Sequence, residues 1–366
     1  MSSSSSNCLV SGSSFSSSLI TRSSCSLAIR RNEFFPSTQR RSGSDNNSTI
    51  NTNKTLKTHF GRVLCNSNAQ SNQQPKGEEN IKEEEEEEYR VVTAVRSMHN
   101  DIIIVDTAKA RFLLLDSTHN VHSVLNKGQK WTGSYWDEFV TLPPIVPEGP
   151  IAIYGLGGGT AAHLMLDVWP HLQLHGWEID QMLIDKAREY FGLSDLETRT
   201  KAGGILNIHI GDALSSTDDN PTRYAVVECL ITNDHVGIVI DLFSEGNVLA
   251  QLQEVATWLE LNKKLMPNGR LMVNCGDIDE KSHLVNGKAH NRSADTWDKH
   301  STIKALSKAF PGQLSWKRMP DTHGANYLAL TGPLPDLTSW SAMVPDVLSE
   351  SVRQWRPCAQ FQDEAL

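Results

Sequence analysis

Apolar positions in the middle of the chain follow two alternating patterns. Between residues 149 and 310, short continuous apolar runs alternate with longer stretches in which apolar residues recur near helical spacing. Short apolar runs bounded by glycine or polar residues are typical of buried strands, and helices of this length between them make the strands parallel. The predicted strands are 151–154, 172–178, 206–210, 236–242 and 270–274, and the predicted helices are 160–168, 181–191, 248–264 and 302–309.

The regions on either side of this alternation predict antiparallel strands. The strand-like runs are 102–105, 111–115 and 121–125 upstream, and 314–318 and 326–330 downstream. The upstream runs predict a small antiparallel β unit within residues 89–128, and the downstream runs predict a closing hairpin. Together the patterns predict an α/β fold: a doubly wound, mostly parallel, seven-stranded sheet within residues 129–332, with helices on both faces.

Two segments do not fit this alternation. Residues 226–236 are additional sequence before the fourth predicted strand, and the strand-like run 224–231 competes with that strand for one place in the sheet. This segment is either an added edge element or an error in the sequence. Residues 333–366, with Trp340 and Trp355, form a tail that is either a docking helix or a partner contact.

The first 88 residues differ in composition from the rest. Residues 1–65 are rich in serine and carry eight basic residues against two acids, which is typical of organellar transit peptides. An ordinary disordered tail is the alternative. Because the arginines lack helical periodicity, we expect import into the chloroplast stroma rather than the mitochondrion, and hence a plant organellar protein. Residues 66–88 are polar and glutamate-rich and predict a disordered acidic linker.

Charge and cysteine spacing exclude several classes of partner. The chain has 34 basic and 43 acidic residues, and removal of the basic N-terminal segment makes the remainder more acidic than the formal net charge of −9. A net-acidic body without a basic stripe argues against nucleic acid as a partner, and a cationic small molecule is compatible with it. No apolar run reaches the length that spans a bilayer. Cys229, Cys275 and Cys358 lack metal-ligand spacing, so we expect no metal.

A glycine cluster and an acid follow the first two predicted strands of the central sheet. The cluster reads Gly155-Leu156-Gly157-Gly158-Gly159-Thr160, and Glu178 ends the next strand. Glycines let the backbone approach a ligand closely, and a carboxylate at this position can accept hydrogen bonds from a ribose diol. The same pair also fits a nicotinamide-binding unit, and a simple turn is the less favoured interpretation of the cluster read alone. Asp180 is expected to cap the helix that begins at residue 181.

Two further acids follow the third and fourth strands. Asp212 and Ala213 stand where a carboxylate can accept from an adenine amine and a backbone N–H can donate to a ring nitrogen, which favours an adenosylmethionine site over a dinucleotide site. Asp212 read alone is equally a turn residue. Asp241 ends an apolar strand, where a carboxylate loses hydration unless it is paired or used. We therefore predict that Asp241 is a catalytic base or a substrate anchor.

Taken together, these segments resemble the spermidine synthase (polyamine aminopropyltransferase) family, a branch of the class I S-adenosylmethionine-dependent methyltransferase superfamily. The resemblance covers about residues 90–332 and includes Tyr135-Trp136-Asp137-Glu138 ahead of Leu142-Pro143. It implies a methyltransferase-like sheet, S-adenosyl-L-methionine or its decarboxylated form as cofactor, and a homodimer. The implied cofactor-binding residues are Gly155, Gly157, Gly158, Gly159, Glu178, Asp212 and Ala213, the catalytic residue is Asp241, and the acceptor pocket is lined by Tyr135 with Asp137 or Glu138.

The chain departs from this family at three positions. Gly158 stands where the family has the aspartate that holds the amine of decarboxylated adenosylmethionine and repels the carboxylate of the intact cofactor. The family's second aspartate after the fourth strand is replaced by Ser244. The glutamine expected before the tyrosine segment falls at Asn120. The loss of the aspartate at residue 158 removes both the grip on the decarboxylated cofactor and the discrimination against the intact one.

Several functions remain open on the sequence alone. The leading hypothesis is an adenosylmethionine-dependent methyltransferase that acts on a small molecule, such as an amine, which Asp241 anchors or deprotonates. The first alternative is aminopropyl transfer from the decarboxylated cofactor to putrescine or a related amine. The second is a non-catalytic protein that binds an adenosyl ligand. A nicotinamide-dependent dehydrogenase is disfavoured by Asp212 and the closing hairpin.

Overall fold

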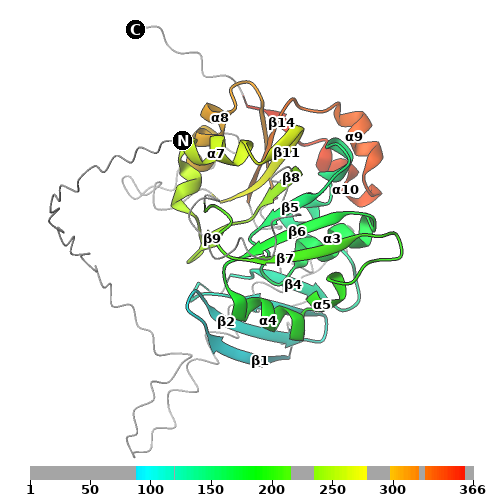
Figure 1. Ribbon diagram of the computed structural model, residues 1–366, viewed down its shortest axis with the longest axis vertical. Helices are drawn as coiled ribbons and strands as arrows, with labels where there is room; N and C mark the ends of the chain where they lie inside the picture. Colours follow the sequence, from blue (N-terminus) through cyan, green and yellow to red (C-terminus); the bar gives the residue numbers. More distant parts are fainter. Residues whose placement is uncertain (1–87, 119, 216–234, 278–296, 321–325, 359–366) are drawn as a thin grey trace, which may run out of the picture. The chain divides into compact units, whose positions relative to one another are not determined.

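The computed structural model describes residues 88–118, 120–215, 235–277, 297–320 and 326–358. They form a central eight-stranded sheet, a four-stranded antiparallel sheet and a two-stranded hairpin (Figure 1). The order of strands in the central sheet is β14-β12-β13-β11-β8-β5-β6-β7. These strands are β5 (Ile151–Tyr154), β6 (Gln173–Glu178), β7 (Ile205–Ile210), β8 (His235–Ile240), β11 (Leu265–Gly276), β12 (Leu314–Arg318), β13 (Tyr327–Thr331) and β14 (Arg356–Pro357).

The five strands from β11 to β7 run parallel. Each pairs in parallel with its neighbour, whereas β13 pairs antiparallel with both β11 and β12. The mostly parallel sheet with a closing hairpin is therefore confirmed. In such a sheet the carboxyl ends of the parallel strands share one edge, where ligands bind.

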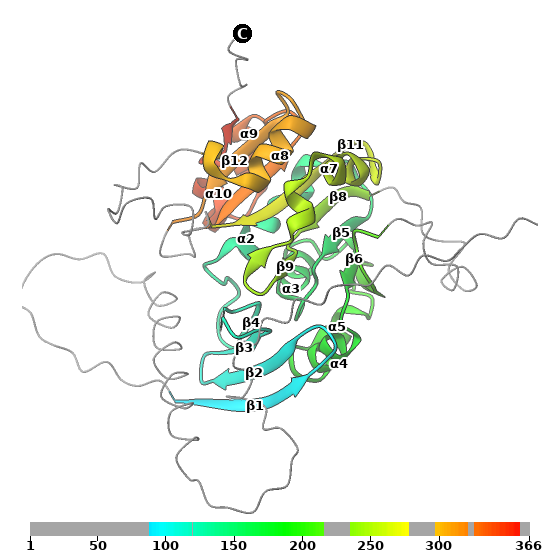
Figure 2. The same cartoon turned by 90° about the vertical axis from the view of Figure 1, so that its left-hand side faces the viewer.

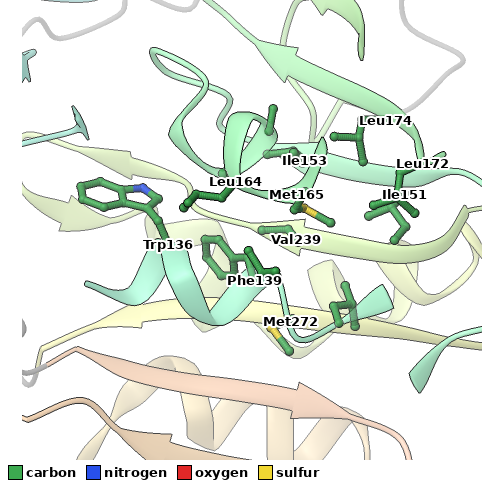
Figure 3. Packing of buried hydrophobic residues seen from close by; sticks show 14 of the residues in the cluster. Trp136, Phe139, Ile151, Ile153, Leu164, Met165, Leu172, Leu174, Val239 and Met272 are labelled. Carbon is green, nitrogen blue, oxygen red and sulfur yellow. The ribbon is translucent and has the colours of Figure 1, made fainter. Parts of the chain in front are cut away.

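Helices cover both faces of the sheet, as the doubly wound pattern predicts. One apolar cluster packs Phe139 and Met165 against Ile153 and the neighbouring strands (Figure 3). A second cluster packs Trp258 against Ile238 on the opposite face. The helices are α2 (Tyr135–Phe139), α3 (Thr160–Val168), α4 (Gln181–Tyr190), α5 (Leu193–Leu196), α7 (Val255–Asn262), α8 (Ser301–Ala309), α9 (Leu337–Met343) and α10 (Asp346–Val352), with 3-10 turns η1 (Pro143–Ile145), η4 (Ala250–Gln253) and η6 (Trp297–Lys299).

The N-terminal sheet has the order β1-β2-β3-β4 and is antiparallel throughout (Figure 2). Its strands are β1 (Tyr89–Arg96), β2 (Asp101–Thr107), β3 (Ala110–Leu114) and β4 (Ser123–Asn126). The sequence pattern predicted the last three strands and missed β1, whose residues are half-buried or exposed. The Val124 N–H donates to the Thr160 hydroxyl at 2.8 Å, which joins β4 to the start of α3 beside the glycine cluster.

The described part of the C-terminal tail folds onto the central sheet. Helices α9 and α10 bury Trp340 and Trp355, and the Trp340 indole N–H donates to the Thr141 carbonyl at 2.8 Å. Strand β14 pairs with β12, so the sheet has an eighth strand that the sequence did not predict. A two-residue strand is too short to produce any periodicity. The competing run 224–231 lies outside the described residues. Within the described ranges, no helix has the length and apolar composition to cross a bilayer.

Candidate functional site

One large cleft runs along the carboxyl ends of the parallel strands. Its cavity volume is about 1840 Å³. The wall formed by the central sheet includes the glycine turn, the end of β6 and the residues after β7 and β8. The opposite wall includes residues of β3 and β4, and Tyr135 lies where α2 begins. The cleft therefore joins most of the segments that the sequence singled out.

The glycine turn fits closely against the end of β8. Gly155 and Gly157 have φ of +88° and +55°, in the left-handed region that favours glycine. A Cβ atom on Gly155 would lie 2.2 Å from the Asp241 carbonyl oxygen, so no larger residue fits there. Both glycines line the cleft. The turn thus presents main-chain atoms without side chains to the cleft.

Gly158 and Gly159 lie in the same turn but face away from the cleft. The Gly158 N–H donates to the Ser123 hydroxyl of β4 at 2.8 Å. A Cβ atom on Gly159 would lie 2.5 Å from the Leu193 side chain. Among the described residues that line the cleft, neither glycine is present. These two predicted cofactor contacts are therefore packing positions, because β4 and α5 occupy the space beside them.

Glu178 connects the end of β6 to the glycine turn. Its Oε2 accepts from the Gly157 N–H at 3.0 Å, and its Oε1 accepts from the Ile179 and Asp180 N–H groups at 2.9 and 3.2 Å. Burial raises the pKa of Glu178, and these hydrogen bonds oppose the rise. The adjacent Ile179 side chain is 45% exposed within the cleft. A fixed carboxylate thus stands beside an exposed apolar side chain in the cleft.

Asp180 caps α4, as the sequence predicted, and also holds the β1–β2 turn. Its Oδ1 accepts from the Met182 N–H at 3.0 Å. Its Oδ2 accepts from the Asn100 amide at 2.8 Å and from the Ser97 hydroxyl. The sequence gave no signal for these contacts. They fix the N-terminal sheet directly next to Glu178.

Asp212 and Ala213 follow β7 and line the cleft. Asp212 is exposed, and its Oδ1 accepts from the Leu214 N–H at 2.8 Å. This is the turn role that the sequence left open. The Lys264 ammonium donates to the Ala213 carbonyl at 3.1 Å. Asp212 therefore shapes its turn and also presents a carboxylate to the cleft.

Asp241 lies at the centre of a hydrogen-bond network. Its Oδ2 accepts from the Tyr135 hydroxyl at 3.1 Å, and its Oδ1 accepts from the Asn274 amide at 2.9 Å. The Asn274 Oδ1 in turn accepts from the Gly276 N–H and from the Asn326 amide, both at 3.0 Å. Burial raises the pKa of Asp241 to about 6, against the lowering effect of these donors. A carboxylate with such a pKa can exchange a proton near neutral pH.

The two acids after Tyr135 do not belong to the acceptor pocket. Asp137 accepts from the Thr132 and Gly133 N–H groups at 3.0 and 2.8 Å and so fixes the loop before α2. Glu138 forms a fully buried ion pair with Lys317. Tyr135 lines the cleft, whereas Glu138 contacts Lys317 and Ser351 of α10. The expectation that Asp137 or Glu138 lines the pocket is wrong.

The residues that line the cleft fit an adenosyl group. The Glu178 Oε2 retains a lone pair for a ribose hydroxyl, Ile179 offers an apolar face for a base, and Asp212 offers an acceptor for an exocyclic amine. Within the described ranges, no group of three or more metal-binding side chains is suited to hold a metal ion. The protein thus combines a mostly parallel central sheet, closed by an antiparallel hairpin, with an N-terminal antiparallel sheet.

No family model matches the chain. In sequence, it is similar to a probable polyamine aminopropyl transferase of Bifidobacterium longum, with 24% identity over 211 residues that cover 57% of this chain and 43% of the relative. It is also similar to trans-aconitate 2-methyltransferase of Streptomyces coelicolor, with 27% identity over 156 residues that cover 41% of this chain and 43% of the relative. The chain thus spans less than half the length of each of these curated relatives.

Solved structures of both kinds of transferase are also similar to the chain. The spermidine synthase from Thermotoga maritima has a TM-score of 0.46 at 16% identity, covering 66% of this chain and 72% of that one. Human methyltransferase-like protein 13 in complex with SAH has a TM-score of 0.39 at 18% identity, covering 63% of this chain and 94% of that one.

Proposed function

We propose that this protein is an S-adenosylmethionine-dependent transferase that uses the intact cofactor and transfers its methyl group. The observation that carries this proposal is the gathering of Glu178, Asp212 and Asp241 around the glycine turn in one cleft. In this proposal Gly155 and Gly157 give the cofactor room, Glu178 holds its ribose, and Asp212 with Ala213 holds its base. The sulfonium of the bound cofactor supplies an activated methyl group.

The form of the cofactor follows from Gly158. Aminopropyltransferases carry an aspartate here, whereas this chain has no side chain at residue 158 and the hydroxyl of Ser123 occupies the adjacent space. An acid that would bind the amine of the decarboxylated cofactor and repel the carboxylate of the intact one is thereby missing from this position. Because residue 158 contributes no acid, nothing at this position repels the carboxylate of the intact cofactor.

Asp241 is the proposed base. The pKa of Asp241, raised to about 6, lets this carboxylate accept a proton from an acceptor N–H or O–H group. Hydrogen bonds from Tyr135 and Asn274 fix the orientation of the carboxylate and so the direction of its remaining lone pairs. Tyr135 has a pKa raised well above its ordinary value, first by burial and then by the charge of Asp241, so it stays a neutral donor. We expect activity to rise with pH through about 6.

Titration calorimetry with purified protein tests this proposal. We expect S-adenosylmethionine to bind with micromolar affinity or better and decarboxylated S-adenosylmethionine to bind at least about tenfold more weakly, the factor that 1.4 kcal/mol represents. Tighter binding of the decarboxylated form would contradict methyl transfer. Failure of both compounds to bind would contradict an adenosyl site altogether.

Aminopropyl transfer is the second candidate, and the Tyr135–Asp241 pair favours it. That pair lies where the resembling family binds and deprotonates its amine, and one sequence relative is a probable polyamine aminopropyl transferase. Production of spermidine from putrescine and the decarboxylated cofactor by the purified chain would establish this reaction. Non-catalytic ligand binding is the better account if Asp241→Asn leaves the protein's function in cells unchanged while Glu178→Ala abolishes that function.

Localisation and assembly are also proposed. The composition of residues 1–65 supports import into the chloroplast stroma of a plant cell. A fluorescent fusion to these residues should accumulate in chloroplasts, and a cytosolic signal would contradict the proposal. The family resemblance supports a homodimer, for which light scattering of the purified chain should give twice the chain mass.

A further inference from the structure

The wall of the cleft next to Asp241 is apolar. The short hairpin of β9 (Phe243–Ser244) and β10 (Asn247–Val248) follows Asp241 directly, and its residues line the cleft. A Cβ atom on Gly276 would lie 3.2 Å from both the Phe243 ring and the Val248 side chain, so these two side chains converge above Gly276. Gly276 in turn donates to Asn274, the partner of Asp241. The hairpin therefore places a phenyl ring and a branched side chain beside the proposed base.

Aromatic rings of α2 line the same cleft beside Asp241. The ring centroids of Tyr135 and Trp136 lie 4.5 Å apart in a tilted arrangement, and both residues line the cleft. Tyr135 also packs edge-on against Phe139 at 5.8 Å, which fixes its ring while its hydroxyl donates to Asp241. Flat, rigid rings that line a cavity bind planar apolar groups well.

The charges along the cleft do not suit a linear dication. Apart from the three proposed cofactor and base carboxylates, the charged residues that line it within the described ranges are one acid, Asp277, and three lysines, Lys109, Lys127 and Lys299. Ser244, the last residue of β9, lines the cleft and is neutral. The second ammonium group of a diamine would therefore lose hydration in the cleft, and no cleft-lining residue of the hairpin would offset that loss with a carboxylate.

Resting on the proposed function, we propose that the acceptor is a small ring compound carrying one nucleophilic N–H or O–H group, rather than a linear diamine. The ring packs between Phe243 and Tyr135, and the nucleophile points at Asp241. The acceptor nitrogen or oxygen forms the new bond to the methyl carbon as the methyl–sulfur bond breaks, and that bonding pair stays on sulfur. The acceptor proton passes to Asp241, so charge and atoms balance.

Release of S-adenosylhomocysteine from S-adenosylmethionine with a matched panel of acceptors tests this proposal. The panel is phenethylamine, catechol, 1-aminobutane and 1,4-diaminobutane. We expect phenethylamine or catechol to have a kcat/KM at least about tenfold above that of 1-aminobutane, which corresponds to 1.4 kcal/mol of added transition-state binding. We expect 1,4-diaminobutane to be no better than 1-aminobutane. A tenfold preference for the diamine over the monoamine overturns the proposal.

Two variants make the result specific to the hairpin. Phe243→Ala should lower turnover of the ring acceptor about tenfold while calorimetry shows an unchanged Kd for S-adenosylmethionine, and Met343→Ala, an exposed change on α9, should alter neither. Ser244→Asp should raise turnover of 1,4-diaminobutane, and Ser244→Asn should not. If Phe243→Ala leaves ring turnover unchanged, or no compound reacts although the cofactor binds, the acceptor class is wrong. If the cofactor itself does not bind, the proposed function fails instead.

Discussion

Replacing Gly158 with aspartate, the residue of the resembling aminopropyltransferases, should destabilise this protein. An added Cβ atom would lie 2.9 Å from the Ser123 Cβ, 3.1 Å from its hydroxyl oxygen and 3.3 Å from the Phe191 ring. The backbone at Gly158 is not left-handed, so steric crowding is the main cost. Overpacking of this kind typically costs about 1–3 kcal/mol in the free energy of unfolding.

Urea unfolding, followed by circular dichroism, measures this cost. With an m value of about 2–3 kcal/mol/M, a loss of about 2 kcal/mol lowers the midpoint by about 0.7–1 M. Gly128→Asp is the matched control, because a Cβ atom on Gly128 has no neighbour within 4 Å, and it should leave the midpoint unchanged. Ser123→Gly removes the obstructing side chain, so the double variant should recover at least about 1 kcal/mol as coupling between the two positions.

The same variants also test cofactor choice. Gly158→Asp alone should not tighten binding of decarboxylated S-adenosylmethionine, because the new carboxylate cannot take its position while Ser123 fills it. A Gly158→Asp protein with the wild-type urea midpoint would refute the steric argument, since the Ser123 side chain would then have moved aside without a loss of stability.

The remaining predictions concern buried charges. Lys317→Met should lower the free energy of unfolding by about 3–5 kcal/mol, because it leaves the Glu138 carboxylate buried without its cation, and Lys263→Met, in a pair with exposed Glu260, should leave the urea midpoint unchanged. For Asp241, burial raises the pKa from 3.8 to about 6, so between these values the folded chain holds a proton that the unfolded chain releases. The contribution of Asp241 to the free energy of unfolding should therefore fall as pH rises through this window and level off above it. Burial also raises the pKa of Asp137 to about 6, so Asp241→Asn should reduce the slope of the pH-dependent unfolding without removing it; an unchanged slope would mean that Asp241 is ionised throughout. Tyr135→Phe removes a donor that lowers the pKa of Asp241, so the midpoint of the pH–activity profile should move upward, and a downward shift would contradict the role of Tyr135.

The main features of the fold were predictable because they depend on periodicity. Buried parallel strands are short apolar runs, and the acids and glycines just after them must meet at one edge of the sheet. That is why Glu178 and Asp241 could be brought into one cleft from their positions in the sequence. Strand β1 was missed because only one half of it alternates between half-buried and exposed positions, so its pattern of apolar residues is weak.

The direction of individual side chains was not predictable from sequence spacing. Asp137 and Glu138 are neighbours of Tyr135 in the sequence, yet the short helix α2 turns them toward Thr132 and Lys317. Gly158 belongs to the glycine turn but faces Ser123, a residue of another sheet. Asn274 was missed because an amide within an apolar strand belongs to no motif, and only the pairing of β11 with β8 brings it to Asp241.

A crystal structure of the chain with S-adenosylhomocysteine tests the central claim most directly. The account predicts the ribose hydroxyls within hydrogen-bond distance of Glu178, the adenine against Ile179 beside Asp212, and the sulfur facing Asp241. An adenosyl ligand bound outside this cleft, or a cleft that stays empty at saturating ligand, would contradict it.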